Sequence, residues 1–263
     1  MLVVKLLIIT SVLIYCQDIR KQSIITKGDY ATIYFGHLNE EIVCLKSFKD
    51  PLALDREVED LQLLNHTNII RFIGRHSVDG VDMLVMEYMP TNLNKVIHGE
   101  AKNNLTLGQK VELLRDVAKA LLYLSENDKY HGDLKPSNIL LSVDGDSIKT
   151  KLCDFSDSKF RRTFMYMCPE NYQYGYKFSY LCDIYSFGMI MYEVLFEIKP
   201  FSHVPDDSDV FKNVFEWKQQ VLEGRRPYIP TIHSTDYINI MTRCWQSDPS
   251  KRPTYQEIID NLK

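Results

Sequence analysis

The most informative part of the sequence is His131-Gly132-Asp133-Leu134-Lys135-Pro136-Ser137-Asn138, followed further along by Asp154-Phe155-Ser156. It concentrates polar groups of the kind that phosphate chemistry requires. The carboxylate of Asp133 can accept a hydrogen bond from a hydroxyl group. Asn138 and Asp154 offer hard oxygen ligands, which Mg²⁺ prefers. The pattern therefore predicts a site at which a magnesium-bound phosphate meets a hydroxyl nucleophile.

The composition bounds the fold and the class of partner. The 263 residues suffice for one large domain or for two closely packed lobes with a sizeable core. The formal net charge of -4, with acids and bases nearly balanced, gives no global attraction to polyanions, so we expect no nucleic-acid partner. The six cysteines include no C-x-x-C pair, and Cys44 and Cys153 fall in strand-like runs. We expect free thiols in a reducing, cytoplasmic compartment, with disulfides as the alternative.

The two quoted segments resemble motifs of eukaryotic protein kinases. Residues 131–138 are similar to the catalytic loop H-R-D-L-K-x-x-N, and residues 154–156 are similar to the D-F-G segment. Gly132 stands in place of the arginine, and Ser156 stands in place of the final glycine. The resemblance implies an α+β, bilobal protein kinase fold. We expect a small β-rich N-lobe over residues 17–88 and a larger helical C-lobe over residues 89–263.

Residues 23–48 read as β-structure, with an apolar pair at residues 24–25, a turn at residues 27–29 and a second turn near Asn39-Glu40. These first strands carry the region that resembles the kinase glycine-rich loop. The loop G-x-G-x-x-G-x-V corresponds to residues 26–33, in which only the middle glycine remains. Glycines matter there because main-chain amides must approach phosphates with no Cβ between them. The missing glycines predict weaker clamping, and an ordinary hairpin is the structural alternative. By the resemblance, the positions that contact a nucleotide here are Thr26, Gly28, Ala31, Ile33 and Cys44.

A lysine and a downstream acid form the next expected element of the site. Lys46 ends a strand that reads V-C-L-K, similar to V-A-I-K in the family, which implies contacts with the α and β phosphates of ATP. An apolar pattern at helical spacing follows over residues 55–64. Because the family places the partner of this lysine on that helix, we expect Glu57 to pair with Lys46. Glu59 is the surface alternative.

Residues 83–89 resemble the strand that leads into the kinase hinge. By that match Met86 is the gatekeeper, and the main chain of Glu87 and Met89 contacts the adenine edge. The same resemblance adds Leu140, which follows the catalytic loop, to the nucleotide-contacting residues.

The resemblance also assigns roles within the catalytic loop. Asp133 would orient the substrate hydroxyl, and Lys135 would neutralise charge on the transferring phosphoryl group. Asp154 would hold the bridging Mg²⁺, and Asn138 would hold a second ion. The implied ligands are therefore ATP and Mg²⁺.

Three features bear on the substrate. Lys135 and Thr163 resemble the pattern of serine/threonine kinases. The span from Asp154 to Glu170 is shorter than the segment that forms the peptide shelf in active kinases. Gly132 removes the arginine that would receive a regulatory phosphate. These departures put turnover on protein substrates in question.

Two helices and two anchoring contacts are expected in the C-lobe. Residues 105–124 read as an amphipathic helix that Thr106 can cap, and residues 181–196 read as a buried helix and not a membrane span. By resemblance, Asp183 holds the backbone of the catalytic loop. In the same way, we expect a structural ion pair of Glu170 with Arg252.

The N-terminal segment, residues 1–16, is mostly apolar. It is too short to span a bilayer and no A-x-A-like cleavage site follows it. We favour an apolar leader that packs on the small lobe over a signal-like or membrane-associating segment.

Two functional hypotheses follow. Near the C-terminus, residues 244–254 resemble the tyrosine-kinase-like branch, and several runs resemble its mixed-lineage-kinase-domain-like pseudokinases, although this chain lacks their N-terminal helical bundle. The favoured hypothesis is a pseudokinase domain that docks on a receptor-interacting serine/threonine kinase and inhibits necroptotic signalling. The alternative is an active kinase that transfers the γ-phosphate of ATP to Ser/Thr hydroxyls.

Overall fold

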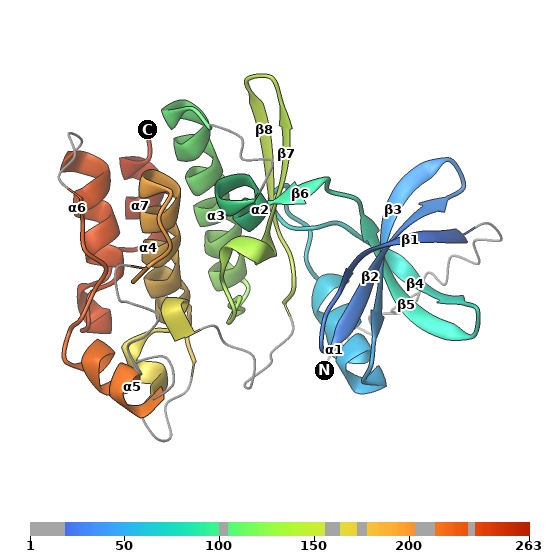
Figure 1. Cartoon of the computed structure of the whole chain (residues 1–263), viewed down its shortest axis with the longest axis horizontal. Helices are drawn as coiled ribbons and strands as arrows, with labels where there is room; N and C mark the ends of the chain where they lie inside the picture. Colours follow the sequence, from blue (N-terminus) through green and yellow to red (C-terminus); the bar gives the residue numbers. More distant parts are fainter. Residues whose placement is uncertain (1–18, 100–104, 156–163, 173–177, 203–213, 231–234) are drawn as a thin grey trace, which may run out of the picture. The chain divides into compact units, whose positions relative to one another are not determined.

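The computed structural model describes residues 19–99, 105–155, 164–172, 178–202, 214–230 and 235–263, with only the backbone at 214–217 and 235–236 (Figure 1). The apolar leader at residues 1–16, Ser156 and Thr163 lie outside the described residues. The chain divides into two compact units, and each is described by itself. The first unit comprises the described residues up to Leu63 and Arg71–Tyr88. The second comprises Leu64–Ile70 and Met89–Lys263.

The first unit is built on a five-stranded antiparallel sheet with the order β1-β2-β3-β5-β4. Two of the predicted turns connect its first three strands. The first strand begins at Ile19, earlier than the apolar pair at residues 24–25 suggested. The strands are β1 (Ile19–Lys27), β2 (Ala31–Leu38), β3 (Glu41–Phe48), β4 (Phe72–Val78) and β5 (Val81–Glu87).

Alternation of side chains gives the two faces of this sheet different roles. One face carries an apolar core cluster of Val43, Leu45, Val78, Met83 and Val85, each at most 9 % exposed. Residues one position along β3, namely Cys44 and Lys46, lie on the opposite face. The core face therefore fixes the register, because a slip by one residue would exchange the two sets.

Helix α1 (Pro51–Leu61) follows the third strand. It begins earlier than residues 55–64 predicted, because Asp50 caps it and proline occupies the first turn. Its buried residues are Ala53, Leu54, Glu57 and Leu61. Glu57 is thus the one buried carboxylate of α1.

The second unit is mostly helical and contains a small three-stranded sheet in the order β6-β7-β8. In Figure 1 the helices α3, α4, α6 and α7 run close together, and α4 contacts both α3 and α6. The α-helices and strands are β6 (Thr91–Asn92), α2 (Leu93–His98), α3 (Leu107–Glu126), β7 (Ile139–Asp144), β8 (Ser147–Leu152), α4 (Tyr180–Phe196), α5 (Val214–Leu222), α6 (Thr235–Cys244) and α7 (Tyr255–Asn261). Short 3₁₀ turns are η1 (Pro136–Asn138), η2 (Phe164–Tyr166), η3 (Pro169–Tyr172) and η4 (Pro249–Lys251).

Helix α3 starts with the predicted cap. Oγ1 of Thr106 accepts a hydrogen bond from the amide of Gln109, and the Gln109 side chain accepts one from the amide of Thr106. This reciprocal capping box satisfies two amides that a helix start otherwise leaves unpaired. The helix buries its apolar stripe against β8, α4 and α7.

Helix α4 is buried along most of its length, as the apolar run predicted. A Cβ at Gly188 would lie 2.9 Å from Cβ of Cys244 on α6, so the two helices approach closely at this glycine. Within the described residues, no helix combines the length and apolarity that a bilayer crossing requires.

The cysteines differ from the expectation in one pair. Cys168 and Cys182 form a disulfide, so the prediction of free thiols is wrong for these two residues. They are separated by 14 positions, and no C-x-x-C spacing marks them; the fold brings them together. The other cysteines of the described residues, Cys44, Cys153 and Cys244, carry thiols outside any disulfide.

Candidate active site

In the first unit, the side chains of Lys46 and Glu57 form a buried ion pair. Nζ of Lys46 donates to both carboxylate oxygens of Glu57, at 2.7 and 2.8 Å. The two residues are 6 % and 0 % exposed, whereas Glu59 lies on the exposed side of α1. The ammonium also lies 4.8 Å from the centre of the Phe48 ring. The helix face thus selects Glu57, as predicted.

Strand register places most of the predicted nucleotide-contacting residues of this unit on the face that carries Lys46. Ile33 pairs with Lys46 and with Thr26, and Cys44 pairs with Met86. Directly paired residues in antiparallel strands point to the same face. Ala31 lies on this face too, two positions before Ile33 on β2. Burial raises the pKa of the Cys44 thiol to about 11, against the lowering effect of Lys46, so this face is poorly solvated around the thiol.

The turn that corresponds to the glycine-rich loop closes on itself. The amide of Gly28 donates to the carbonyl of Ala31 at 2.9 Å, and a Cβ at residue 28 would lie 3.3 Å from that oxygen. The turn itself therefore leaves little room for a side chain at residue 28, independently of any ligand. This amide is engaged within the hairpin.

The end of β5, the strand that leads into the predicted hinge, is held by hydrogen bonds with Arg71. The amide of Glu87 donates to the carbonyl of Arg71 at 3.1 Å, and the Glu87 carboxylate accepts from the Arg71 amide at 2.7 Å. Any main-chain contact of Glu87 with a ligand would therefore involve its carbonyl group. Met89 and Leu140 belong to the second unit.

In the second unit, helix α4 holds the backbone of the catalytic loop. The carboxylate of Asp183, 1 % exposed, accepts hydrogen bonds from the amides of His131 at 2.6 Å and Gly132 at 3.0 Å. This is the contact expected from the resemblance. Gly132 has a φ of +81°, a conformation that residues with a Cβ rarely adopt.

A buried histidine completes the support of the loop. Nδ1 of His131 accepts from the amide of Asp133 at 3.3 Å, and Nε2 faces the carbonyl of Cys153 at 3.1 Å. The neutral imidazole with its proton on Nε2 satisfies both contacts. The ring also lies 5.2 Å from the ring of Phe155, which is buried. His131 thus ties the catalytic loop to the segment that carries Asp154.

The predicted catalytic groups are assembled around Asp133. Nζ of Lys135 lies 2.5 Å from Oδ2 of Asp133, and Nδ2 of Asn138 donates to the main-chain carbonyl of Asp133 at 2.9 Å. The Asp133 side chain is 11 % exposed, and that of Lys135 is 22 % exposed. The carboxylate and the ammonium are therefore positioned together before any substrate arrives.

The two predicted metal ligands are neighbours. The amide of Cys153 donates to the carbonyl of Asn138 at 3.1 Å, which places Asp154 next to Asn138. Asp154 has a φ of +68°, which is uncommon for a residue with a side chain and typical of functional strain. The side-chain amide nitrogen of Asn138 is engaged by the loop, so its oxygen is the atom that fits a cation. An amide oxygen and a carboxylate match the hard ligands of Mg²⁺.

The described residues 164–172, which we call the ledge segment, include the end of the Asp154–Glu170 span, which was predicted to be too short for a full peptide shelf; residues 156–163 of that span lie outside the described residues. The Tyr166 hydroxyl donates to Glu193 of α4 at 2.6 Å, and its carbonyl accepts from the Ser186 hydroxyl at 2.7 Å. The other oxygen of Glu193 lies 2.7 Å from Nε2 of His98. The sequence analysis missed this buried Tyr166–Glu193–His98 network. A carboxylate within an apolar helical run was its only signal.

The end of the ledge segment is held by the expected ion pair. Arg252 donates to both oxygens of Glu170, and its Nη1 also donates to the carbonyl of Leu181 at 2.9 Å. Arg252 and Glu170 are buried, so the contact is structural.

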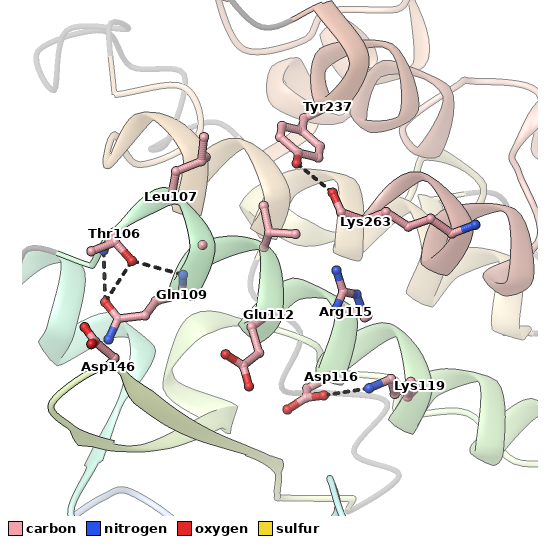
Figure 2. Close-up of a pocket in the computed structure, with 12 residues that line it drawn as sticks. Thr106, Leu107, Gln109, Glu112, Arg115, Asp116, Lys119, Asp146, Tyr237 and Lys263 are labelled. Carbon is pink, nitrogen blue, oxygen red and sulfur yellow. Dashed lines mark hydrogen bonds and ion pairs between the residues drawn. The ribbon is translucent and has the colours of Figure 1, made fainter.

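A cavity of about 650 Å³ lies along α3, and no residue of the catalytic loop lines it. Figure 2 shows its charged side chains partly satisfied by neighbours. Lys119 pairs with Asp116 at 3.1 Å, and the Tyr237 hydroxyl donates to the carbonyl of Lys263 at 3.2 Å. Its acids (Glu112, Asp116, Asp146) are balanced by its bases (Arg115, Lys119, Lys263). Its balanced charges favour neither anionic nor cationic ligands. The volume of the cavity is therefore not sufficient to identify it as the active site.

Comparison with known proteins agrees with the fold and the loop geometry. A family model described as "Protein kinase domain" matches residues 19–262. The chain therefore belongs to the protein kinase domain family, whose members in general bind ATP and Mg²⁺.

Several curated proteins are similar to this chain. Probable serine/threonine-protein kinase gdt2 of Dictyostelium discoideum is 33% identical over 258 residues, 91% of this chain and 15% of that protein. Mitogen-activated protein kinase kinase kinase 7 of Drosophila melanogaster is 28% identical over 247 residues, 88% of this chain and 35% of that protein. Dual specificity protein kinase shkC of Dictyostelium discoideum is 27% identical over 270 residues, 94% of this chain and 51% of that protein. The chain thus spans about half of these relatives' length or less.

Proposed function

We propose that this chain is an active protein kinase that transfers the γ-phosphoryl group of ATP to serine or threonine hydroxyls of a protein. The observation that carries the proposal is the preassembled group of Asp133, Lys135 and Asn138. The relatives named as serine/threonine kinases support it at the level of the family. The proposal reverses the order of the two hypotheses drawn from the sequence.

Each group has a chemical task in this proposal. Asp133 accepts a hydrogen bond from the substrate hydroxyl and aligns it for in-line attack; a carboxylate is a weak base, so alignment is its main contribution. Lys135 places positive charge beside the transferring group. Asn138 and Asp154 would hold Mg²⁺, which supplies charge neutralisation on the phosphates. Lys46, oriented by Glu57, would hold the nucleotide's α and β phosphates.

The test is Mg²⁺-dependent transfer from ATP to a generic protein substrate. Asp133→Asn keeps the shape of the side chain and removes its charge, so we expect transfer to fall roughly 10²- to 10⁴-fold. Lys46→Met should weaken the thermal stabilisation by nucleotide, whereas Asp133→Asn should leave it intact. Phosphoamino-acid analysis of the product separates serine and threonine from tyrosine. Equal rates for the wild type and Asp133→Asn would refute the enzyme.

A second candidate is a docking module, and two observations favour it. Gly132 offers no cation to a regulatory phosphate, and the Gly28 amide is already engaged in its turn. In this proposal the chain resembles the mixed-lineage-kinase-domain-like pseudokinases. It occupies a receptor-interacting serine/threonine kinase in the cytoplasm and so inhibits necroptotic signalling. Titration calorimetry with such a kinase domain tests it, and no heat of binding at micromolar concentrations would remove it. Membrane association through residues 1–16 is the less favoured addition.

A further inference from the structure

The disulfide of Cys168 and Cys182 joins two segments that serve different parts of the site. Cys168 lies in the ledge segment between η2 and η3, and Cys182 lies in the first turn of α4. The Cα atoms are 5.3 Å apart, within the range of native disulfides. Both residues are 0 % exposed. The bond is therefore an internal link between the ledge segment and a rigid helix.

Each cysteine is followed closely in sequence by a residue that holds part of the candidate site in place. Cys182 directly precedes Asp183, whose carboxylate holds the catalytic loop. Cys168 precedes Pro169 and Glu170, and Glu170 is bound by Arg252. The disulfide thus fixes the position of the ledge segment relative to the helix that fixes the catalytic loop.

We propose that Cys168 and Cys182 are a reversible oxidation site: the disulfide holds the ledge segment on α4, and reduction loosens it. The expected consequence is tighter binding of a polypeptide substrate by the oxidised chain. That consequence rests on the proposed kinase function. The modification itself does not.

The chemistry requires a two-electron oxidant, and a hydroperoxide such as hydrogen peroxide supplies it. One thiolate attacks the peroxide, the O–O bond breaks and a sulfenic acid forms. The second thiol then displaces the sulfenic oxygen, the S–S bond forms and water leaves. In total two S–H bonds are lost, two electrons reach the peroxide, and two water molecules carry the protons. A dithiol reductant reverses the step by exchange.

The surroundings accept both oxidation states. Sγ of Cys182 lies 3.6 Å from Oε1 of Glu170, so a reduced thiol has an acceptor in place. Arg252 holds the same carboxylate and compensates its charge. Because both sulfur atoms are buried, oxidant and reductant act only after local opening, so interconversion is slow.

A covalent link also fits the composition of the catalytic loop. Gly132 has no side chain that could bind a phosphate on the neighbouring segment, so phosphorylation has no cation to engage at that position. A disulfide restricts the ledge segment without requiring such a cation. The restriction lowers the conformational freedom that the ledge segment loses when it binds a peptide.

The two cysteines and Glu170 together also offer three ligand atoms of the kind that bind a metal ion. The ligand atoms of Cys168, Glu170 and Cys182 lie within 4.8 Å of one another. The Glu170 carboxylate, however, is occupied by the guanidinium of Arg252, whose charge opposes a cation. The geometry therefore favours the disulfide over a metal site.

The experiment compares the full chain after peroxide treatment with the chain after reduction. Cys168→Ala and Cys182→Ala remove either partner, and Cys244→Ala, a buried free cysteine, is the matched control. Alkylation in denaturant followed by mass spectrometry of unreduced digests reports the cross-linked peptide. Thermal unfolding reports the restraint. Steady-state kinetics report KM for a peptide and for ATP separately.

We expect the cross-linked peptide in the oxidised wild type and in Cys244→Ala. Reduction should lower their unfolding midpoints by roughly 4–12 °C and leave the other two variants unchanged. It should raise KM for the peptide by roughly two- to tenfold and leave KM for ATP unchanged. A wild type without the cross-link after peroxide, or one that binds stoichiometric zinc that a chelator removes, would overturn the proposal. An oxidised chain that shows the cross-link and the midpoint shift but transfers no phosphate keeps the modification and refutes the kinase instead.

Discussion

The hydroxyl of Tyr166 in the ledge segment donates a 2.6 Å hydrogen bond to Oε2 of Glu193 on helix α4. Glu193 is 0 % exposed, so its charge depends on the groups around it. The contact joins the ledge segment, whose Tyr166 lines the same small pocket as Asp133, to a buried part of α4.

Tyr166→Phe removes one hydrogen bond from this buried carboxylate. We expect the free energy of unfolding to fall by about 1–3 kcal/mol, because a buried acceptor loses its donor. Urea unfolding measures the change. Tyr180→Phe, at an exposed tyrosine, is the control and should change little. Equal effects of the two substitutions would contradict the assigned role.

The stability should also depend on pH through Glu193. Burial raises the pKa of its carboxyl above the ordinary 4.5, while hydrogen bonds from Tyr166 and His98 pull it back. A raised pKa in the folded state stabilises the protein below pH 4.5 and loses that contribution as pH rises through the folded value. The wild type should therefore lose stability relative to Glu193→Gln as pH rises from about 4.5.

This comparison needs unfolding curves at several pH values in two backgrounds. Because the imidazole of His98 contacts the same carboxylate, the same pair of curves in a His98→Asn background isolates the carboxylate. Parallel pH profiles of the wild type and Glu193→Gln would show that the carboxyl does not titrate in this range.

The ion pair of Lys46 and Glu57 should be costly to break from one side. Either Lys46→Met or Glu57→Met removes one partner of a buried ion pair, and we expect each to lower the free energy of unfolding by about 3–5 kcal/mol. The double variant should cost much less than the sum, because both charges of the pair are removed together.

The exposed pair of Arg75 and Asp82 provides the control cycle. Their side chains are 39 % and 47 % exposed. We expect a coupling energy of about 0.2–1 kcal/mol for that pair. Similar coupling energies for the two pairs, measured by chemical unfolding, would contradict the burial argument.

Gly132 should resist substitution by alanine. Its φ of +81° lies in the left-handed region, so Gly132→Ala should destabilise the protein by about 1–2 kcal/mol. Gly108→Ala is the matched control, because Gly108 lies in the first turn of α3 and a Cβ there meets only the Thr106 hydroxyl at 3.8 Å. That control should be neutral or stabilise by about 0.4–1 kcal/mol. Calorimetric unfolding of both variants measures the change in stability. A Gly132→Ala variant that is as stable as the wild type would contradict the predicted strain of an alanine at this φ.

Asp183→Asn should affect turnover more than nucleotide binding. The change replaces one of the two acceptors for the amides of His131 and Gly132 with a donor, which misplaces the loop. We expect a lower kcat with unchanged thermal stabilisation by nucleotide. Asp116→Asn on α3, a partly buried carboxylate that pairs with Lys119, is the control. A lost nucleotide response with normal kcat would show that Asp183 does not act through the catalytic loop.

Much of this architecture was predictable because local signals agreed with the fold. Alternation in β3 and the Asn39-Glu40 turn gave the hairpin. The resemblance to the family, which places the partner of Lys46 on the helix after residue 55, indicated Glu57. Helix α1 nevertheless began earlier than predicted, since the weight of the Asp50-Pro51 start was overlooked.

The remaining parts depend on contacts between distant residues, which no local pattern encodes. Cys168 and Cys182 meet only because the ledge segment folds back on α4. Tyr166 and His98 lie far apart in sequence and converge on one carboxylate. Positive φ values at Gly132 and Asp154 are likewise imposed by the surroundings of each residue.

Helix α4 carries Asp183 at its start, Ser186 one turn further and Glu193 near its end. This one helix therefore sets the positions of both the catalytic loop and the ledge segment. A ligand or substitution that tilts α4 would move Asp133, the group proposed to align the hydroxyl, together with the ledge segment. Under the proposed kinase function, a substitution at the close contact of Gly188 with α6 should therefore lower phosphate transfer without competing with nucleotide.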